Sequence, residues 1–250
     1  MSDVKYLRRW RVGAIRLLLV AVTSGALLVA TVGPALANGA GYHHSGAVTQ
    51  NQAWGAQATM RVEDPSVPTG TESFLVQRIM VKRADNSHWL EVGWVEWGKW
   101  LGPNGYPEKR IYTWDHVAPW RTYQTSYPIA YDDVITVRIL HPVDCGDTAC
   151  AWTAQLFWDG AWRSLRSVSL PMIDTGIVEE FTETWHHNAS HWSIAVDGGL
   201  DWYDTKLRIS SGSWLLWTTS FATTPNDSCP YHTRWYDLYY RFYTWWGTCP

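Results

Sequence analysis

The sequence predicts an all-β fold, an antiparallel β-sandwich of two packed sheets that forms one domain over residues 53–250. From Trp54 onward, short runs of β-branched and aromatic residues are broken by Gly, Pro, Asn and Asp. Breaks about every ten residues are typical of a sandwich or barrel. No segment sustains a helical apolar period over three turns. The length left after the N-terminal segment suits one large β domain better than two small ones.

The individual strands are predicted from runs of β-branched and aromatic residues bounded by turn residues. Turns are expected at Asp64-Pro65, at 103–105, at Asp159-Gly160 and at 197–199. The candidate strands cover 56–62, 73–82, 88–97, 110–114, 134–140, 151–158, 176–184, 190–196, 205–209 and 214–220.

The first 37 residues predict a cleavable export signal, so we expect a secreted, extracellular protein. A basic start carrying Arg8, Arg9 and Arg11 is followed by an apolar stretch that closes on Ala35-Leu36-Ala37. A signal peptidase recognises this order of features. An uncleaved anchor is the alternative, because the apolar stretch is long enough to span a membrane. Gly33 and Pro34, with the small residues at the end, favour cleavage after residue 37.

The segment 38–52, rich in Gly, His, Ser and Gln, is predicted to be a flexible leader. Removing residues 1–37 takes away five of the 20 Lys and Arg and one of the 23 Asp and Glu, which leaves a formal charge of −7. An acidic protein of this kind disfavours nucleic acid as a partner. We expect no membrane contact after cleavage, and a monomer.

All four cysteines lie in the exported part, which predicts two disulfides in an oxidising compartment. Four cysteines allow three pairings. We favour Cys145 with Cys150, across a short turn, and Cys229 with Cys249, which would close a C-terminal loop over 229–249. That loop holds many aromatic residues, which could form a late strand pair or a surface that stacks on sugars.

The chain carries 19 tryptophans, and only Trp10 lies in the export signal. Each ring is large and its N–H needs a partner when buried, so we do not expect all of them in one core. Some would line an aromatic groove for sugar rings or for an extended peptide. The alternative is that most of them cover sheet faces and form cross-strand pairs.

Two acidic segments carry the candidate chemistry. Strand alternation places Trp89, Glu91, Gly93 and Trp97 on one face of 88–97, so that Glu91 lies on an otherwise apolar face. Burial there would raise its pKa unless a partner compensates. Gly93 would leave room for a ligand beside it.

In the segment 176–184 the same alternation separates Glu179 and Glu183 from Glu180. If Glu183 lies near Glu91, within about 6 Å on one face, the two carboxyl groups would titrate as a coupled pair. One could act as a general base on water while the other, protonated, polarises a carbonyl oxygen. Such a pair predicts hydrolysis at acidic pH.

A family resemblance supports this reading. Gly55-Ala-Gln-Ala-Thr-Met-Arg-Val62, Ser73-Phe-Leu-Val-Gln-Arg-Ile-Met-Val81 and Leu90-Glu-Val-Gly-Trp94 resemble the neprosin domain and the wider glutamic-peptidase sandwiches. The resemblance implies a catalytic carboxyl group at Glu91 and a second one at Glu183, with Glu180 next. The cysteine turn that neprosins carry after a Tyr-Trp strand is absent near Tyr112-Thr-Trp114.

The function predicted from the sequence is therefore a glutamic-peptidase-like hydrolase. Its substrate would be an extended peptide or a polysaccharide, contacted by Gln77, Trp89, Trp94 and Trp97. The alternatives are a secreted module that binds carbohydrate or a cell-wall polymer without catalysis, and a surface protein without a ligand. We expect no cofactor and no metal, because His187 and His191, four residues apart, lack the intervening Glu of a zincin motif.

Overall fold

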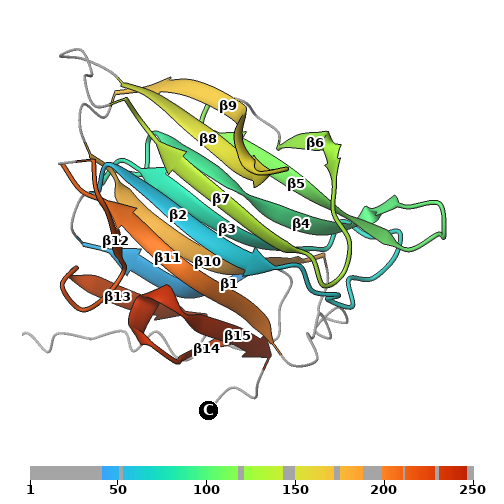
Figure 1. Cartoon of the computed structure of the whole chain (residues 1–250). Helices are drawn as coiled ribbons and strands as arrows, with labels where there is room; N and C mark the ends of the chain where they lie inside the picture. The colour runs from blue at the N-terminus through green and yellow to red at the C-terminus, as the bar shows by residue number, and fades with distance from the viewer. Residues whose placement is uncertain are drawn as a thin grey trace, which may run out of the picture. The chain divides into compact units, whose positions relative to one another are not determined.

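The computed structural model describes residues 41–50, 53–117, 121–142, 150–171, 175–187, 199–210, 212–228 and 231–246. In these residues the named elements are β-strands, apart from the 3₁₀ turn η2 (Leu238–Tyr240). The strands form two antiparallel sheets packed face to face, which confirms the predicted β-sandwich (Figure 1). The expected export signal lies outside the described residues.

The first sheet has seven strands, and each neighbouring pair is antiparallel. Its centre is β3, which lies between β10 and β4. In spatial order the strands are β13 (Thr223–Asp227), β1 (Gly41–Thr49), β10 (Ile177–His186), β3 (Phe74–Lys82), β4 (Trp89–Leu101), β5 (Pro107–Asp115) and β6 (Thr122–Pro128).

The second sheet packs against one face of the first. Its strands follow the order β14 (Tyr231–Trp235), β15 (Phe242–Trp246), β11 (Leu200–Arg208), β2 (Gly55–Arg61), β7 (Val134–Leu140), β8 (Cys150–Trp158) and β9 (Ala161–Leu170), and β12 (Trp214–Leu216) also pairs with β11.

The main core lies between the sheets because alternate residues of the central strands point inward. Leu75, Ile79 and Val81 of β3 meet side chains from β2, β7 and β8 there. Four tryptophans are fully buried in this core: Trp94, Trp152, Trp202 and Trp217. These four rings cover sheet faces inside the core, which was the alternative to lining a groove for a ligand.

The predicted flexible leader over 38–52 is wrong over residues 41–49, which form strand β1. Figure 1 shows β1 lying between β10 and β13, two strands from distant parts of the sequence. Backbone pairing on both edges stabilises this strand despite its polar composition. Its inward polar groups also find partners, since Ser45 donates to Asp227 and Thr49 Oγ1 accepts the Val178 N–H.

Each candidate strand predicted from the sequence that lies within the described residues coincides at least in part with a strand of the structure. Three edge strands were missed: β6, β9 and β13. The candidate strand 190–196 lies outside the described residues. The C-terminal aromatic segment forms the strand pair β14–β15, one of the two alternatives expected for it.

Only one of the four cysteines, Cys150, lies in the described residues, where it begins β8 and is buried. Cys145, Cys229 and Cys249 lie outside them, so the two disulfide pairings stay predictions.

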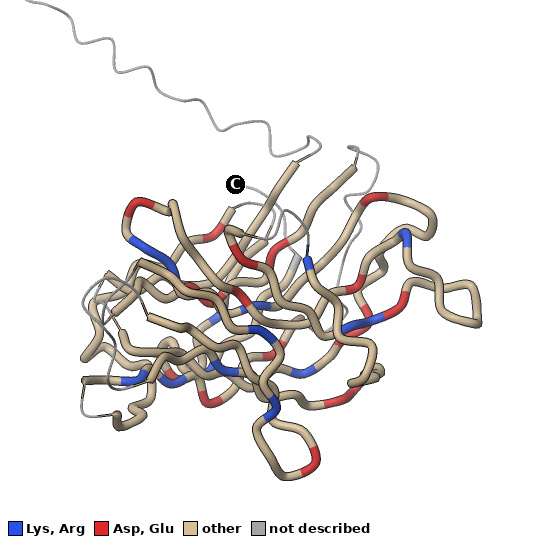
Figure 2. Tube along the Cα trace, turned by 90° about the horizontal axis from the view of Figure 1, so that it is seen from above, with Lys and Arg blue, Asp and Glu red and all other residues tan. Residues whose placement is uncertain are grey.

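Lys and Arg positions are interspersed with Asp and Glu positions along the chain trace (Figure 2). This distribution shows no separate basic end in the part of the chain that the structure describes. No helix in that part is long and apolar enough to cross a membrane.

Candidate functional site

The candidate site lies on the face of the seven-stranded sheet that points away from the second sheet, here called the outer face. In β3 the residues Phe74, Val76 and Arg78 point to this face, whereas Leu75 and Ile79 point into the main core. The outer face has an apolar cluster of its own, formed by Phe74, Val76, Val95 and Tyr112 with Trp97, Trp100, Trp114, Tyr123 and Trp185 packed against them.

Arg78 occupies the centre of the outer face, and strand register explains its surroundings. The residues directly opposite Arg78 are Phe181 on β10 and Gly93 on β4. Glu179 and Glu183 flank Phe181, two residues away on either side, and Glu91 lies two residues from Gly93. A long side chain reaches such diagonal neighbours across a sheet. The chain therefore brings three carboxylates around one guanidinium.

The distances confirm that these four side chains form one cluster, called here the arginine–glutamate cluster. Arg78 Nε donates to Glu183 Oε2 at 3.1 Å and lies 3.3 Å from Glu91 Oε2. Arg78 Nη1 and Nη2 each donate to Glu179 Oε2 at 3.2 Å. Glu91 and Glu183, on strands at either side of β3, thus meet at a single nitrogen atom.

The carboxyl groups of Glu91 and Glu183 differ in how deeply they are buried. The Glu91 side chain is 5 % exposed, and burial raises its pKa to about 7 against the opposing effect of Arg78 and Arg121. Glu183 adds to the rise through its negative charge. Below neutral pH, Glu91 is therefore a neutral acid that can donate a proton. The Glu183 side chain is more accessible, with 15 % of its surface exposed.

Glu179 behaves in the opposite way. Burial would raise its pKa, but the charges and hydrogen bonds of Arg78 and Lys82 outweigh burial and hold the pKa below its usual value. Lys82 forms an ion pair with the second oxygen of Glu179. Glu179 is thus an ionised residue whose two oxygens are both engaged, and it anchors Arg78.

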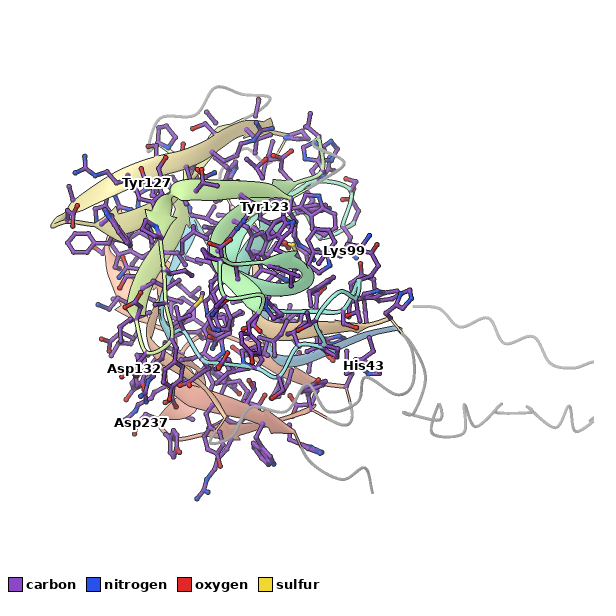
Figure 3. All side chains as sticks on the ribbon, turned by 90° about the vertical axis from the view of Figure 1, so that its right-hand side faces the viewer. His43, Lys99, Tyr123, Tyr127, Asp132 and Asp237 are labelled. Atoms are coloured by element: carbon purple, nitrogen blue, oxygen red, sulfur yellow. The ribbon has the colours of Figure 1, made fainter. Side chains whose placement is uncertain are left out.

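Aromatic rings and a second arginine surround the cluster. Arg121, which directly precedes β6, lies over the rings of Phe74 and Trp114 at 4.2 and 4.6 Å. Tyr42 of β1 packs on Trp185 with 4.6 Å between ring centroids. At the other side, Tyr123 of β6, labelled in Figure 3, packs against Trp100.

The structure brings together two of the three predicted catalytic residues. Glu91 and Glu183 share the outer face and meet at Arg78. Glu180 lies on the opposite, inner face of β10 and is fully buried, 0 % exposed, beside Thr205. Burial raises the pKa of Glu180 well above its usual value, so this group is a neutral carboxylic acid inside the sandwich.

The four predicted substrate-contacting residues divide between the two faces. Gln77 and Trp94 lie in the main core, where Trp94 Nε1 donates to Gln77 Oε1 at 2.7 Å and Gln77 donates to the Asp201 carbonyl. The prediction that they contact a substrate is wrong, because side chains alternate along a strand and these two point to the inner face, away from the outer one. Trp89 and Trp97 do lie on that face, packed against Trp114 and Trp100.

Gly93 does not leave the room for a ligand that was expected of it. A Cβ atom built on Gly93 would lie 1.9 Å from the Gln77 carbonyl oxygen and 2.9 Å from Arg78 Cα. The absent side chain permits a close approach of the β3 backbone instead. Gly93 therefore brings Arg78 near the strand that carries Glu91.

Sequence reasoning missed Arg78, Lys82 and Arg121. Arg78 could have been found, because a charged residue within the apolar run 73–81 requires a buried partner. Arg121 carried no such signal, since it lies outside any of the predicted strands and directly precedes β6.

A cavity of about 650 Å³ lies elsewhere, between the segment 64–69 and the β4–β5 hairpin. Its lining includes Glu96, whose pKa burial raises to about 7, and Lys109, which lies between Glu96 and Asp64 at 2.9 and 2.6 Å. Exposed rings of Tyr106 and Tyr131 flank it. This cavity contains none of the predicted site residues.

The described residues contain no group of three or more His, Cys, Asp or Glu side chains arranged to hold a metal ion. His186 is buried in the sandwich, with Nε2 3.2 Å from the Tyr231 hydroxyl, and His191 lies outside the described residues.

No protein-family model and no curated protein sequence matches the chain. Among solved structures, scytalido-glutamic peptidase with a transition state analog inhibitor is similar, with a TM-score of 0.54 and 11 % identity over 83 % of this chain and 98 % of that one. A second structure of scytalido-glutamic peptidase, with a peptide-based transition state analog, has a TM-score of 0.52 at 11 % identity and the same coverage. The chain therefore shares the sandwich fold of a glutamic peptidase.

Proposed function

We propose that this protein is a glutamic-peptidase-like hydrolase that cleaves peptide bonds at acidic pH with Glu91 and Glu183. The observation that carries the proposal is the meeting of these carboxyl groups at Arg78 Nε, 3.3 and 3.1 Å away. Two carboxyl groups with different surroundings can divide the roles of acid and base. The shared fold with scytalido-glutamic peptidase supports a peptide as substrate.

In the proposed reaction Glu183 is the general base and Glu91 the general acid. Glu183 takes a proton from a water molecule, whose oxygen attacks the carbonyl carbon of the peptide bond. Glu91 donates its proton toward the carbonyl oxygen as negative charge develops there. When the tetrahedral intermediate collapses, the C–N bond breaks and the proton held by Glu183 passes to the leaving nitrogen. The proton that Glu91 gave to the former carbonyl oxygen returns to Glu91 as the C=O bond re-forms, which restores both residues.

The assignment follows from the environment of each group. Glu91 is the more deeply buried, and its pKa of about 7 keeps it protonated in acid. Glu183 is the more exposed and accepts a charge-assisted hydrogen bond from Arg78, which orients the carboxylate. Arg78 is in this account a positioning residue, and Glu179 with Lys82 fixes Arg78 in place.

The test is cleavage of a denatured protein substrate at pH 4 by the exported chain and its variants. We expect Glu91→Gln and Glu183→Gln each to reduce the rate at least about 10²-fold, the usual contribution of a positioned acid or base. Glu180→Gln is the matched control, since it changes a buried carboxylic acid of the same strand on the other face. Cleavage that survives either of the first two substitutions would remove that residue from the mechanism.

We also propose that the protein acts outside the cell, after removal of residues 1–37. A peptidase that needs protonated Glu91 suits an acidic exterior. Labelling the N-terminus of the secreted product would test this, and a product that still begins at residue 1 would contradict it.

Carbohydrate binding remains the second candidate function, and one observation favours it. Tyr106 and Tyr131, 68 and 58 % exposed, flank the cavity that contains Glu96 and Lys109. Exposed rings beside polar groups can stack on sugars while the polar groups bind hydroxyls. A glycan-binding screen that compares the native chain with Tyr106→Ala tests this candidate separately from cleavage.

A further inference from the structure

Arg121 differs from the other cations of the outer face because no carboxylate among the described residues pairs with it. Arg78 contacts three carboxylates and Lys82 contacts one, and Arg110 forms an ion pair with Glu108. Within the part of the chain that the structure describes, Arg121 makes no ion pair, and its buried Nε has no hydrogen-bond acceptor.

Aromatic faces hold the Arg121 guanidinium in place. Its central carbon lies 4.2 Å from the Phe74 ring centroid, 4.6 Å from Trp114 and 5.6 Å from Tyr112. A planar guanidinium packed on rings still presents its N–H donors along its edge, where they match the two oxygens of a carboxylate. Arg121 is thus a preorganised cation with unused donors.

Arg121 belongs to the same site as the candidate catalytic pair. Its charge acts on Glu91, lowering the pKa of that group, and both Glu91 and Glu183 raise the pKa of Arg121. Tyr42, which is 55 % exposed, lies within electrostatic reach of Arg121, Glu183 and Glu91.

Charge balance at this site depends on Glu91. The cations Arg78, Lys82 and Arg121 face the carboxylates of Glu91, Glu179 and Glu183. His44 also faces Glu183 from β1, and the nearby tyrosines, Tyr42, Tyr112 and Tyr123, have raised pKa values and stay neutral. When Glu91 is protonated, as the proposed reaction requires, the positive charges exceed the negative ones and the excess lies at Arg121.

We propose that Arg121 binds a carboxylate of the peptide substrate, so that peptides with an acidic side chain or a C-terminal carboxylate near the cleaved bond are preferred. This inference rests on the proposed peptidase function and adds a substrate class to it. Both sources present the same anion, and a guanidinium and a carboxylate can form two parallel charge-assisted hydrogen bonds.

The test uses pairs of peptides that differ only in charge at one place. In one pair a Glu next to the cleaved bond is replaced by Gln, and in the other the C-terminal carboxylate is replaced by an amide. We expect the native protein to favour the charged member of one pair at least about tenfold in kcat/KM, mainly through KM, as a hydrogen-bonded ion pair of about 1.4 kcal/mol predicts. The pair that shows the preference identifies the source of the carboxylate.

The variant Arg121→Gln should bring this ratio close to one, and Arg121→Lys should restore part of it. Arg110→Gln is the matched control, because Arg110 also lies over a ring, 4.3 Å from Trp100, but already has Glu108 as partner. It should keep the native ratio. No preference in the native protein, or a preference that survives Arg121→Gln, would overturn the proposal.

Binding of the same peptides, followed by tryptophan fluorescence, separates the two proposals. If no peptide is cleaved but the charged members bind more tightly and Arg121→Gln abolishes the difference, the peptidase function fails and the carboxylate site stands. If peptides are cleaved but charged and uncharged members bind equally, the carboxylate site fails and the peptidase function stands. Unfolding curves of both Arg121 variants check that they fold.

Discussion

At the scale of single residues, neighbouring glutamates of one strand have opposite chemistry because they point to opposite faces. Glu179 is ionised beside Arg78 and Lys82, whereas Glu180 is enclosed between the sheets with burial raising its pKa. Glu91 lies between these extremes with a pKa of about 7. Position in the sheet, and not residue type, decides which carboxyl group can act as an acid.

Glu180 should make the protein less stable as pH rises. Its folded pKa is raised above the usual 4.5, so the folded state binds a proton that the unfolded state releases above that pH. The free energy of unfolding then falls with increasing pH above 4.5. We expect Glu180→Gln to gain stability relative to the native protein between pH 4 and pH 7, because the substitution removes this proton linkage. Urea unfolding at both values checks this, and parallel pH dependence of the two proteins would contradict it.

Arg78 should contribute to stability through the carboxylates that it neutralises. Arg78→Met leaves Glu91, Glu179 and Glu183 buried without their shared cation, which should cost about 3–5 kcal/mol at pH 7. The loss should shrink at pH 4, where Glu91, with its pKa of about 7, is protonated and no longer needs the cation. Arg110→Met, which breaks a more exposed ion pair with Glu108, should cost about 1 kcal/mol or less. Equal losses in the two variants by urea unfolding would show that Arg78 is not central to the cluster.

At the scale of strands, the sequence predicted the central elements well and the edges poorly. Segments such as 73–82 and 88–97 are rich in β-branched and aromatic residues because both faces of their strands are largely buried. β6 and β9 interleave polar residues with aromatic or aliphatic ones and are only partly buried, and β1 is rich in Gly, His and Ser. Backbone pairing stabilises these three strands, and backbone hydrogen bonds leave no side-chain pattern in a sequence.

Gly93 allows the backbones of β3 and β4 to approach closely beside the arginine–glutamate cluster. Gly93→Ala would force a Cβ atom against the Gln77 carbonyl and the Arg78 backbone, so the β3–β4 pair must separate. We expect a loss of about 1–3 kcal/mol in the free energy of unfolding. Gly102→Ala, where the nearest atom is the Asn104 side-chain oxygen at 3.3 Å, should cost less than about 1 kcal/mol. Thermal unfolding of both variants measures the difference, and a harmless Gly93→Ala would show that the strands are not so close.

Residues 41–49 form strand β1 in the structure, whereas the sequence predicted a flexible leader there. Its backbone pairs with β10 and β13, and Ala47 and Ser45 are fully buried. A chain that begins at residue 51 instead of residue 38 should therefore be unfolded or sensitive to proteolysis at low protease concentration. A flexible leader would instead be removed without any change in thermal unfolding, and that result would contradict the assignment of β1.

At the scale of the whole molecule, the sequence predicted the sandwich and placed Glu91 and Glu183 on the faces that they occupy. It did not predict that β3 lies between the strands that carry them, because strand order depends on long-range pairing. For the same reason Arg78, directly between both glutamates, was not recognised as their common partner. The errors at Gln77 and Trp94 have a local cause. In a strand, neighbouring residues point to opposite faces, and this rule was not applied to these two residues, which point into the core and not to the outer face.

The most direct test of the proposed acid–base pair is the pH dependence of kcat/KM for a cleaved peptide between pH 2 and 8. Because Glu91 must be protonated and its pKa is about 7, the rate should fall as pH rises through this value. Glu91→Gln should be inactive across the range, with Glu180→Gln retaining the native profile. A rate that rises through pH 7, or a profile that Glu91→Gln leaves unchanged, would contradict the assignment of Glu91 as the acid.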